Sequence, residues 1–238
     1  MKKRALTFVL LAAAVLVATT LASASGVTCR NGPGCLNGSA HFDWTLSYGP
    51  PFSPIPNNSL ALLSTGVAFA QVNFGQGGDG ERVDQGNGWN GNFRRGDELL
   101  WTNSPGQGPL TLTFFGFGVT GVGANIQTDF FGPFTALIQG FGPSGDLIDS
   151  FSESGNSNPD GDGSAIFIGL QGLVDYSSVT FSITSCVADC NDFAINQLDI
   201  NPAHTDLIPE PASLFLFGTG LLGLGGGRRL FSRRRVRS

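Results

Sequence analysis

Lysine is absent from the whole interior of this sequence. Both lysines stand at positions 2 and 3, and residues 25–208 hold four arginines against 17 of the 18 acidic residues, a formal charge of −13. Such a surface repels the phosphates of nucleic acids and anionic lipids. The composition therefore excludes nucleic acid as a partner of this segment and predicts a solvated, acidic body. The four arginines are Arg30, Arg82, Arg94 and Arg95.

Histidine is almost as scarce, which narrows the catalytic chemistry. His41 and His204 are the two histidines, and they form no pair with metal-ligand spacing. A Gly-x-Ser-x-Gly elbow is absent, and the two Gly-x-Gly-x-x-Gly matches lie outside any βαβ pattern. The adjacent acids Asp97 and Glu98 remain as candidates for glycoside hydrolysis. We therefore expect a non-enzymatic protein without a required cofactor, and a secreted polysaccharide hydrolase is the least favoured alternative.

Helical periodicity is also scarce, whereas short alternating apolar runs recur between glycine-rich turns. These runs predict an all-β fold, with a single β-sandwich or jelly-roll domain over residues 25–200 and a linker at 201–208. Residues 142–145 have the proline of a type I turn and predict a hairpin. Residues 75–92 are expected to form a long flexible loop. The predicted strands are 42–48, 60–74, 110–119, 134–141, 147–151, 165–170, 179–184 and 193–200.

Long apolar runs occur only at the two ends. Residues 1–24 have three basic residues, an apolar stretch and the small residues 22–24, as in a secretory signal peptide that signal peptidase removes after Ala24. Residues 212–227 are apolar and uncharged, and as a helix they reach roughly 24 Å, short of the roughly 30 Å hydrocarbon core. We expect a marginal transmembrane helix whose basic tail, residues 228–238, stays in the cytoplasm. The tail arginines are Arg228, Arg229, Arg233, Arg234, Arg235 and Arg237.

The junction before this span carries a short motif. Pro209, Glu210 and Pro211 form an extended segment that cannot join the following helix. With a signal peptide at one end and this tripeptide, a short span and arginines at the other, residues 209–238 resemble the PEP-CTERM sorting signal of Gram-negative bacteria. The resemblance implies recognition by an exosortase, a membrane-embedded transpeptidase. The alternative is an ordinary single-pass anchor whose prolines end a linker.

The four cysteines of an exported chain favour disulfides, because the periplasm is oxidising. Three pairings exist, and we favour Cys29 with Cys35 and Cys186 with Cys190, which close short loops. Each of these disulfides would contribute roughly 2 kcal/mol by chain entropy. A metal-binding or redox role is disfavoured, because the cysteines have no histidine nearby and do not have the usual Cys-x-x-Cys spacing.

The sequence suggests two further candidate binding sites, and for each of them an alternative remains. Asn156, Asn158, Asp160 and Asp162 place oxygen-bearing side chains at alternate positions of one loop, as a calcium-binding loop does, although the glutamate of such loops is missing. The alternative is a solvated turn. Trp44, Trp89 and Trp101 are candidates for glycan stacking, but tryptophans on strands also form cores.

The body also resembles the β-sandwich domains that often precede this sorting signal. The phrases that carry the resemblance cover residues 88–93, 96–102, 121–127, 165–169 and 191–196. We expect an exported protein of the cell surface or extracellular matrix, with a structural or adhesive role associated with exopolysaccharide and biofilm. It would pass through an inner-membrane intermediate. The alternative from another class is a carbohydrate-binding module.

Overall fold

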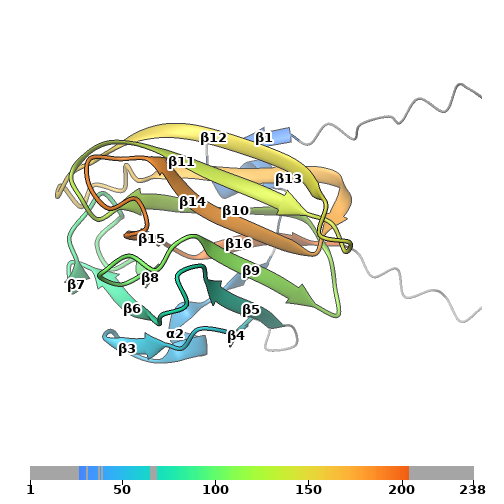
Figure 1. The fold of residues 1–238 in the computed structure, drawn as a ribbon, viewed down its shortest axis with the longest axis horizontal. Helices are drawn as coiled ribbons and strands as arrows, with labels where there is room; N and C mark the ends of the chain where they lie inside the picture. The colour runs from blue at the N-terminus through green and yellow to red at the C-terminus, as the bar shows by residue number, and fades with distance from the viewer. Residues whose placement is uncertain (1–26, 31, 37, 39, 65–68, 204–238) are drawn as a thin grey trace, which may run out of the picture. The chain divides into compact units, whose positions relative to one another are not determined.

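The computed structural model describes residues 27–203, apart from residues 31, 37, 39 and 65–68 (Figure 1). The predicted signal peptide, sorting motif, apolar span, basic tail and His204 lie outside the described residues. Within the described part of the chain, no helix is both long and apolar enough to cross a bilayer.

The body is an all-β structure made of two sheets, and neighbouring strands are antiparallel apart from the β6–β7 pair. Sheet A has the path β1 (Val27–Cys29), β13 (Ile166–Tyr176), β10 (Val119–Thr128), β15 (Phe193–Ile195), β8 (Glu98–Trp101), β6 (Gly80–Gln85) and β3 (Ser53–Ile55). Three further strands join it, namely β16 (Leu198–Pro202), β2 (Ala40–Phe42) and β7 (Gly88–Trp89).

Sheet B has six strands, which follow one another from the top to the bottom of Figure 1. Their order is β12 (Leu147–Ser157), β11 (Gly132–Phe141), β14 (Ser178–Ser185), β9 (Leu110–Phe115), β5 (Phe69–Phe74) and β4 (Ser59–Leu62). The expected hairpin is confirmed, because β11 and β12 pair along their length and the amide of Gly145 donates to the carbonyl of Gly142 at 2.9 Å.

The main core lies between the two sheets. Alternate residues of each strand point inward, so Leu100 and Ile126 of sheet A belong to the same buried cluster as Ile138 and Phe181 of sheet B. This pattern follows from the two-residue period of a strand. The sandwich predicted from the alternating runs is therefore confirmed.

The outer face of sheet A carries two smaller buried clusters. Leu99, one residue before the inward-facing Leu100, packs with Trp89 and Phe93 under the segment that follows β7. Phe167 packs with Leu36 and Cys29 under η1 (Pro33–Leu36), a short 3-10 helix. These two covered regions, the β7 cap and the η1 cap, leave a stretch of the sheet open between them.

Two predictions about local structure were wrong. Residues 44–48 form a helix, α2 (Trp44–Tyr48), because the Asp43 side chain accepts the Leu46 amide at 2.8 Å and starts a helical turn. The expected loop at 75–92 contains β6, which is hydrogen-bonded to β3 and β8. In both places a specific partner overrides the local pattern.

Three predicted strands are in fact pairs of strands. The 110–119 run holds β9 and the start of β10, with Gly116 at φ 77° between them, a conformation that favours glycine. The 193–200 run is divided into β15 and β16, both of which pair with β10. The 60–74 run covers most of β4 and all of β5.

Candidate functional site: a polar groove on sheet A

A polar groove lies on the outer face of sheet A, beside the β7 cap and the η1 cap. Its main part has a volume of about 450 Å³, and a second hollow of about 200 Å³ adjoins it. Asp97, Asn125 and Asn196 line both parts. The main part is also lined by Asp43, Glu98 and Asp199, so carboxylates and amides dominate the surface.

The centre of the groove forms where β10 changes partner. β16 pairs with the first half of β10 and β15 with its last residues, so Asn125 faces the link between the two partner strands. The Asn196 side chain accepts the Asn125 amide at 2.9 Å and donates to the Asn125 side chain at 3.2 Å. The Asn125 side chain donates to the carbonyl of Ala165 at 2.6 Å. These contacts hold both amides in fixed positions.

Asp97 stands in a tight turn that ends the β7 cap. Its carboxylate accepts the backbone amide of Arg94 at 3.1 Å, and its own amide donates to the carbonyl of Arg94 at 2.9 Å. The turn therefore holds the Asp97 carboxylate, which also forms a hydrogen bond with the Asn196 side chain.

Glu98 belongs to a different network, centred on the buried Arg82. The Arg82 guanidinium contacts Glu98 at 3.3 Å, donates to the Thr45 hydroxyl at 2.5 Å and pairs with Asp84. The other oxygen of Glu98 accepts the amide of Thr45 at 3.2 Å. Glu98 is therefore engaged in joining β8 to β6 and α2.

Burial changes the acidity of two groove carboxyls. Burial raises the pKa of Asp97, and the hydrogen bond and charge of Arg94 and the Asn196 side chain oppose this rise. Burial also raises the pKa of Asp199, against a hydrogen bond from Gln197 at 2.8 Å and the charge of His41. Both carboxyls therefore hold a proton at higher pH than free aspartate.

The chemistry of this groove suits a ligand with many hydroxyl groups. Carboxylate oxygens accept hydrogen bonds from hydroxyls, and amide side chains both donate and accept. The fixed amides of Asn125 and Asn196 lower the ordering cost of such contacts. Three of the sequence phrases that carry the resemblance of the body, around 96–102, 121–127 and 191–196, meet here.

Of the three tryptophans singled out from the sequence, Trp44 lines the groove but is only 1% exposed, and its indole N–H donates to the carbonyl of Asn196 at 2.8 Å. Trp89 and Trp101 lie away from the groove. Trp89 is 3% exposed, and its ring packs edge-on against Trp101 at 5.9 Å between centroids. The indole N–H of Trp101 donates to Asp192 at 2.6 Å, which fixes the ring on the β7 cap. Neither ring lines the groove, and Trp89 presents no open face to a sugar.

The predicted calcium loop is tied down by local hydrogen bonds. The Asn158 side chain accepts the amide of Asp160 at 2.9 Å, and the Asp162 side chain accepts that of Ser164 at 3.0 Å. The hydrogen bonds from Ser164 lower the pKa of Asp162. Among the residues that the structure describes, no three acidic, histidine or cysteine side chains are grouped as metal ligands. Calcium binding by Asn156, Asn158, Asp160 and Asp162 stays a prediction.

Both favoured disulfides are present. Cys29 pairs with Cys35 beside the η1 cap, and Cys186 pairs with Cys190 in the link between β14 and β15. Each bond closes a local loop at the margin of the body.

Sequence reasoning identified Asp97 and Glu98 and missed the roles of Asp43, Asn125, Asn196 and Asp199. The available signal was a polar residue at an outward position of a strand, as Asn125 is in β10. Asp43 was hidden because its helix was predicted as a strand.

Comparison with known proteins adds information mainly about the C-terminal end. The sequence matches the PEP-CTERM protein-sorting motif over residues 207–229. No curated protein is significantly similar to the chain. A crystal structure of a DUF4465 family protein from Bacteroides caccae is similar over 67% of this chain and 98% of its own, with 10% identity and a TM-score of 0.39. The chain thus carries a PEP-CTERM sorting motif after an all-β body, as an exported protein that is targeted to exosortase.

Proposed function

We propose that the protein is a structural or adhesive component of the cell surface or extracellular matrix, and that its body binds exopolysaccharide in the polar groove. The observation that carries the proposal is the convergence of Asp97, Asn125 and Asn196 in one groove with fixed side chains. Sugars are recognised by such planar amides and carboxylates because each can bond neighbouring hydroxyls.

The adjacent acids Asp97 and Glu98 do not form the free pair that hydrolysis would need, which favours binding as the role of the groove. Hydrolysis of a glycosidic bond needs two free carboxyl groups, one of which donates a proton. Glu98 is instead held by Arg82 and by the amide of Thr45. A carbohydrate-binding module with the same groove is the second candidate, and it differs from the first in serving an attached activity instead of anchoring the matrix.

A glycan array tests the groove directly. The full chain would be exported to a bacterial periplasm, extracted in mild detergent and applied to arrayed neutral and acidic oligosaccharides. We expect binding that falls at least about tenfold in Asp97→Asn and Asn196→Ala, equal to about 1.4 kcal/mol. Asp97→Asn keeps an acceptor for the Arg94 amide, so its fold is preserved.

The matched control is Asp160→Asn, which changes an exposed acid of the predicted calcium loop. Its binding is expected to equal that of the wild type. Wild-type protein that binds no oligosaccharide, or groove variants that bind as well as the wild type, would refute the proposed role of the groove.

A further inference from the structure

The outer face of sheet B is exposed and carries no charge. Along β11, the buried residues Phe134, Ala136 and Ile138 alternate with the more exposed Thr135 and Leu137. The same alternation holds in β4, β5 and β9, in β14 as far as Thr184, and in β12 from Asp149 onward, after a register shift near its start. All the outward positions of the six described strands are hydroxyl, amide or apolar residues.

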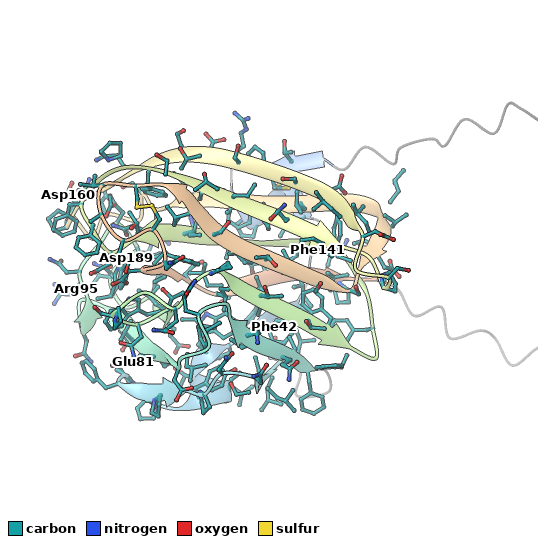
Figure 2. The ribbon with its side chains drawn as sticks, in the orientation of Figure 1. Phe42, Glu81, Arg95, Phe141, Asp160 and Asp189 are labelled. Atoms are coloured by element: carbon teal, nitrogen blue, oxygen red, sulfur yellow. A yellow bond between two sulfur atoms is a disulfide. The ribbon has the colours of Figure 1, made fainter. Side chains whose placement is uncertain are left out.

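This neutrality is unusual in a body with a formal charge of −13. The acids of this region are not at its outward positions: Asp149 of β12 accepts the hydroxyl of the buried Tyr176 at 2.5 Å, and Asp146 lies in the β11–β12 turn. Figure 2 shows Asp160 and Asp189 at the end of the body opposite to Phe141. Glu153 of β12 alternates with the outward Ser152 and Ser154 and pairs with Arg30 at 3.1 Å. Sheet B therefore has a broad surface free of the charge that covers the rest of the body.

The polar groups of this face form rows across the strands. One row runs through Ser150, Gln139, Thr180, Thr111 and Asn73, each directly opposite the next in the strand register. The hydroxyls of Thr111 and Thr180 lie 2.9 Å apart and share a hydrogen bond. With strands about 4.8 Å apart, the five interstrand gaps make the face about 24 Å wide.

One end of the face is apolar. Phe115 and Phe69 are opposite each other on β9 and β5 and are 47% and 40% exposed. Leu60 of β4 is 51% exposed. Sugar rings have apolar C–H faces that pack on aromatic side chains, so this apolar patch at the strand ends beside the polar row suits the same polymer as the row itself.

The residue composition of this face indicates which kind of partner it can bind. Protein–protein interfaces are enriched in aromatic residues, methionine and arginine and depleted in serine, whereas this face is rich in serine and threonine. Anionic polymers and lipid headgroups offer charges that the face cannot pair, and the acidic remainder of the body repels them. An uncharged polymer covered with hydroxyls is complementary to it.

We infer that the outer face of sheet B docks on the surface of a neutral polysaccharide, at a site separate from the groove on sheet A. The rows of hydroxyls and amides exchange hydrogen bonds with the polymer, and Phe69 and Phe115 stack on its sugar rings. The identity of the polymer class rests on the proposed association with polysaccharide, but the binding surface does not.

Retention on insoluble polymers tests this inference with the full chain in mild detergent. The probes are microcrystalline cellulose and curdlan as neutral polymers and alginate beads as an anionic one. Retention on a neutral polymer is expected to fall at least about tenfold in Thr111→Val/Thr180→Val/Gln139→Glu, which keeps the side-chain shapes while removing hydroxyls and adding a charge. Alginate should not retain the wild type.

The exposed Asp160→Asn variant is the matched control and should be retained like the wild type. Circular dichroism and thermal unfolding verify that the face variant is folded. Face variants that are retained as well as the wild type, or an Asp160→Asn variant that loses retention to the same extent as the face variant, would overturn the inference. Wild-type protein that neither neutral polymer retains would also overturn it. Loss of array binding in the groove variants with normal retention on neutral polymers separates the two sites.

Discussion

Asp192 is a buried carboxyl group whose hydrogen-bond donor is an indole instead of a cation. It is 2% exposed and accepts the N–H of Trp101 at 2.6 Å. Burial raises the pKa of Asp192 to about 6, the Trp101 hydrogen bond opposes this rise, and the charges of Asp129 and Asp189 add to it. The folded protein therefore binds a proton here more tightly than the unfolded chain does.

The stability of the body should consequently depend on pH through this residue. Between the unfolded pKa of 3.8 and the folded pKa of about 6, the folded state holds more protons, so its stability falls as the pH rises. From pH 5 to pH 7.5, we expect the wild type to lose about 1.4 kcal/mol of unfolding free energy relative to Asp192→Asn. Asparagine keeps the acceptor for Trp101. Urea unfolding at the two pH values measures the difference.

The exposed Asp160→Asn variant serves as the control and should follow the wild-type pH profile. Parallel profiles for the wild type and Asp192→Asn would contradict the assignment of this pH dependence to Asp192.

At the scale of elements, α2 depends on a single capping side chain. Asp43 accepts the Leu46 amide at 2.8 Å and also lines the groove. Asp43→Ala should destabilise the body by about 1 kcal/mol, because the first turn of the helix loses its capping acceptor. Asp43→Asn keeps an acceptor and should change the stability by only a few tenths of a kcal/mol.

Urea unfolding of both variants at one pH checks this prediction. Equal losses in the two variants would mean that the charge of Asp43, and not its capping hydrogen bond, stabilises the helix.

The elements also show what the sequence could and could not predict. The β11–β12 hairpin was predictable, because its turn proline and alternating residues are local signals. Trp44–Tyr48 reads as a strand by composition, and only the geometry of the Asp43 cap makes it helical. β6 has a polar sequence that gains its strand conformation from pairing with β3 and β8. The groove depends on the register of β10 against two partner strands, which no local pattern contains.

For the whole molecule, export and sorting depend on the two ends of the chain. The PEP-CTERM motif at residues 207–229 predicts that exosortase processes the protein at the membrane. In a host with an exosortase, the exported wild type should lack the residues after the motif when its mass is measured. Pro209→Ala/Glu210→Ala/Pro211→Ala should keep its full C-terminus and stay in the membrane fraction.

Asp206→Ala, just before the matched motif, should be processed like the wild type. Exported wild-type protein with an intact C-terminus would exclude processing by exosortase and leave the ordinary anchor as the explanation.

The position of β16 has a mechanical consequence for a protein attached through its C-terminal side. β16 is the last strand of the body, and it is hydrogen-bonded to β10 on one side and to β2 on the other. A pulling force that enters the body at Pro202 therefore acts on an interior strand with two ladders. Extraction of β16 must break the hydrogen bonds on both sides, so a force applied there is shared by three strands before the body begins to unravel.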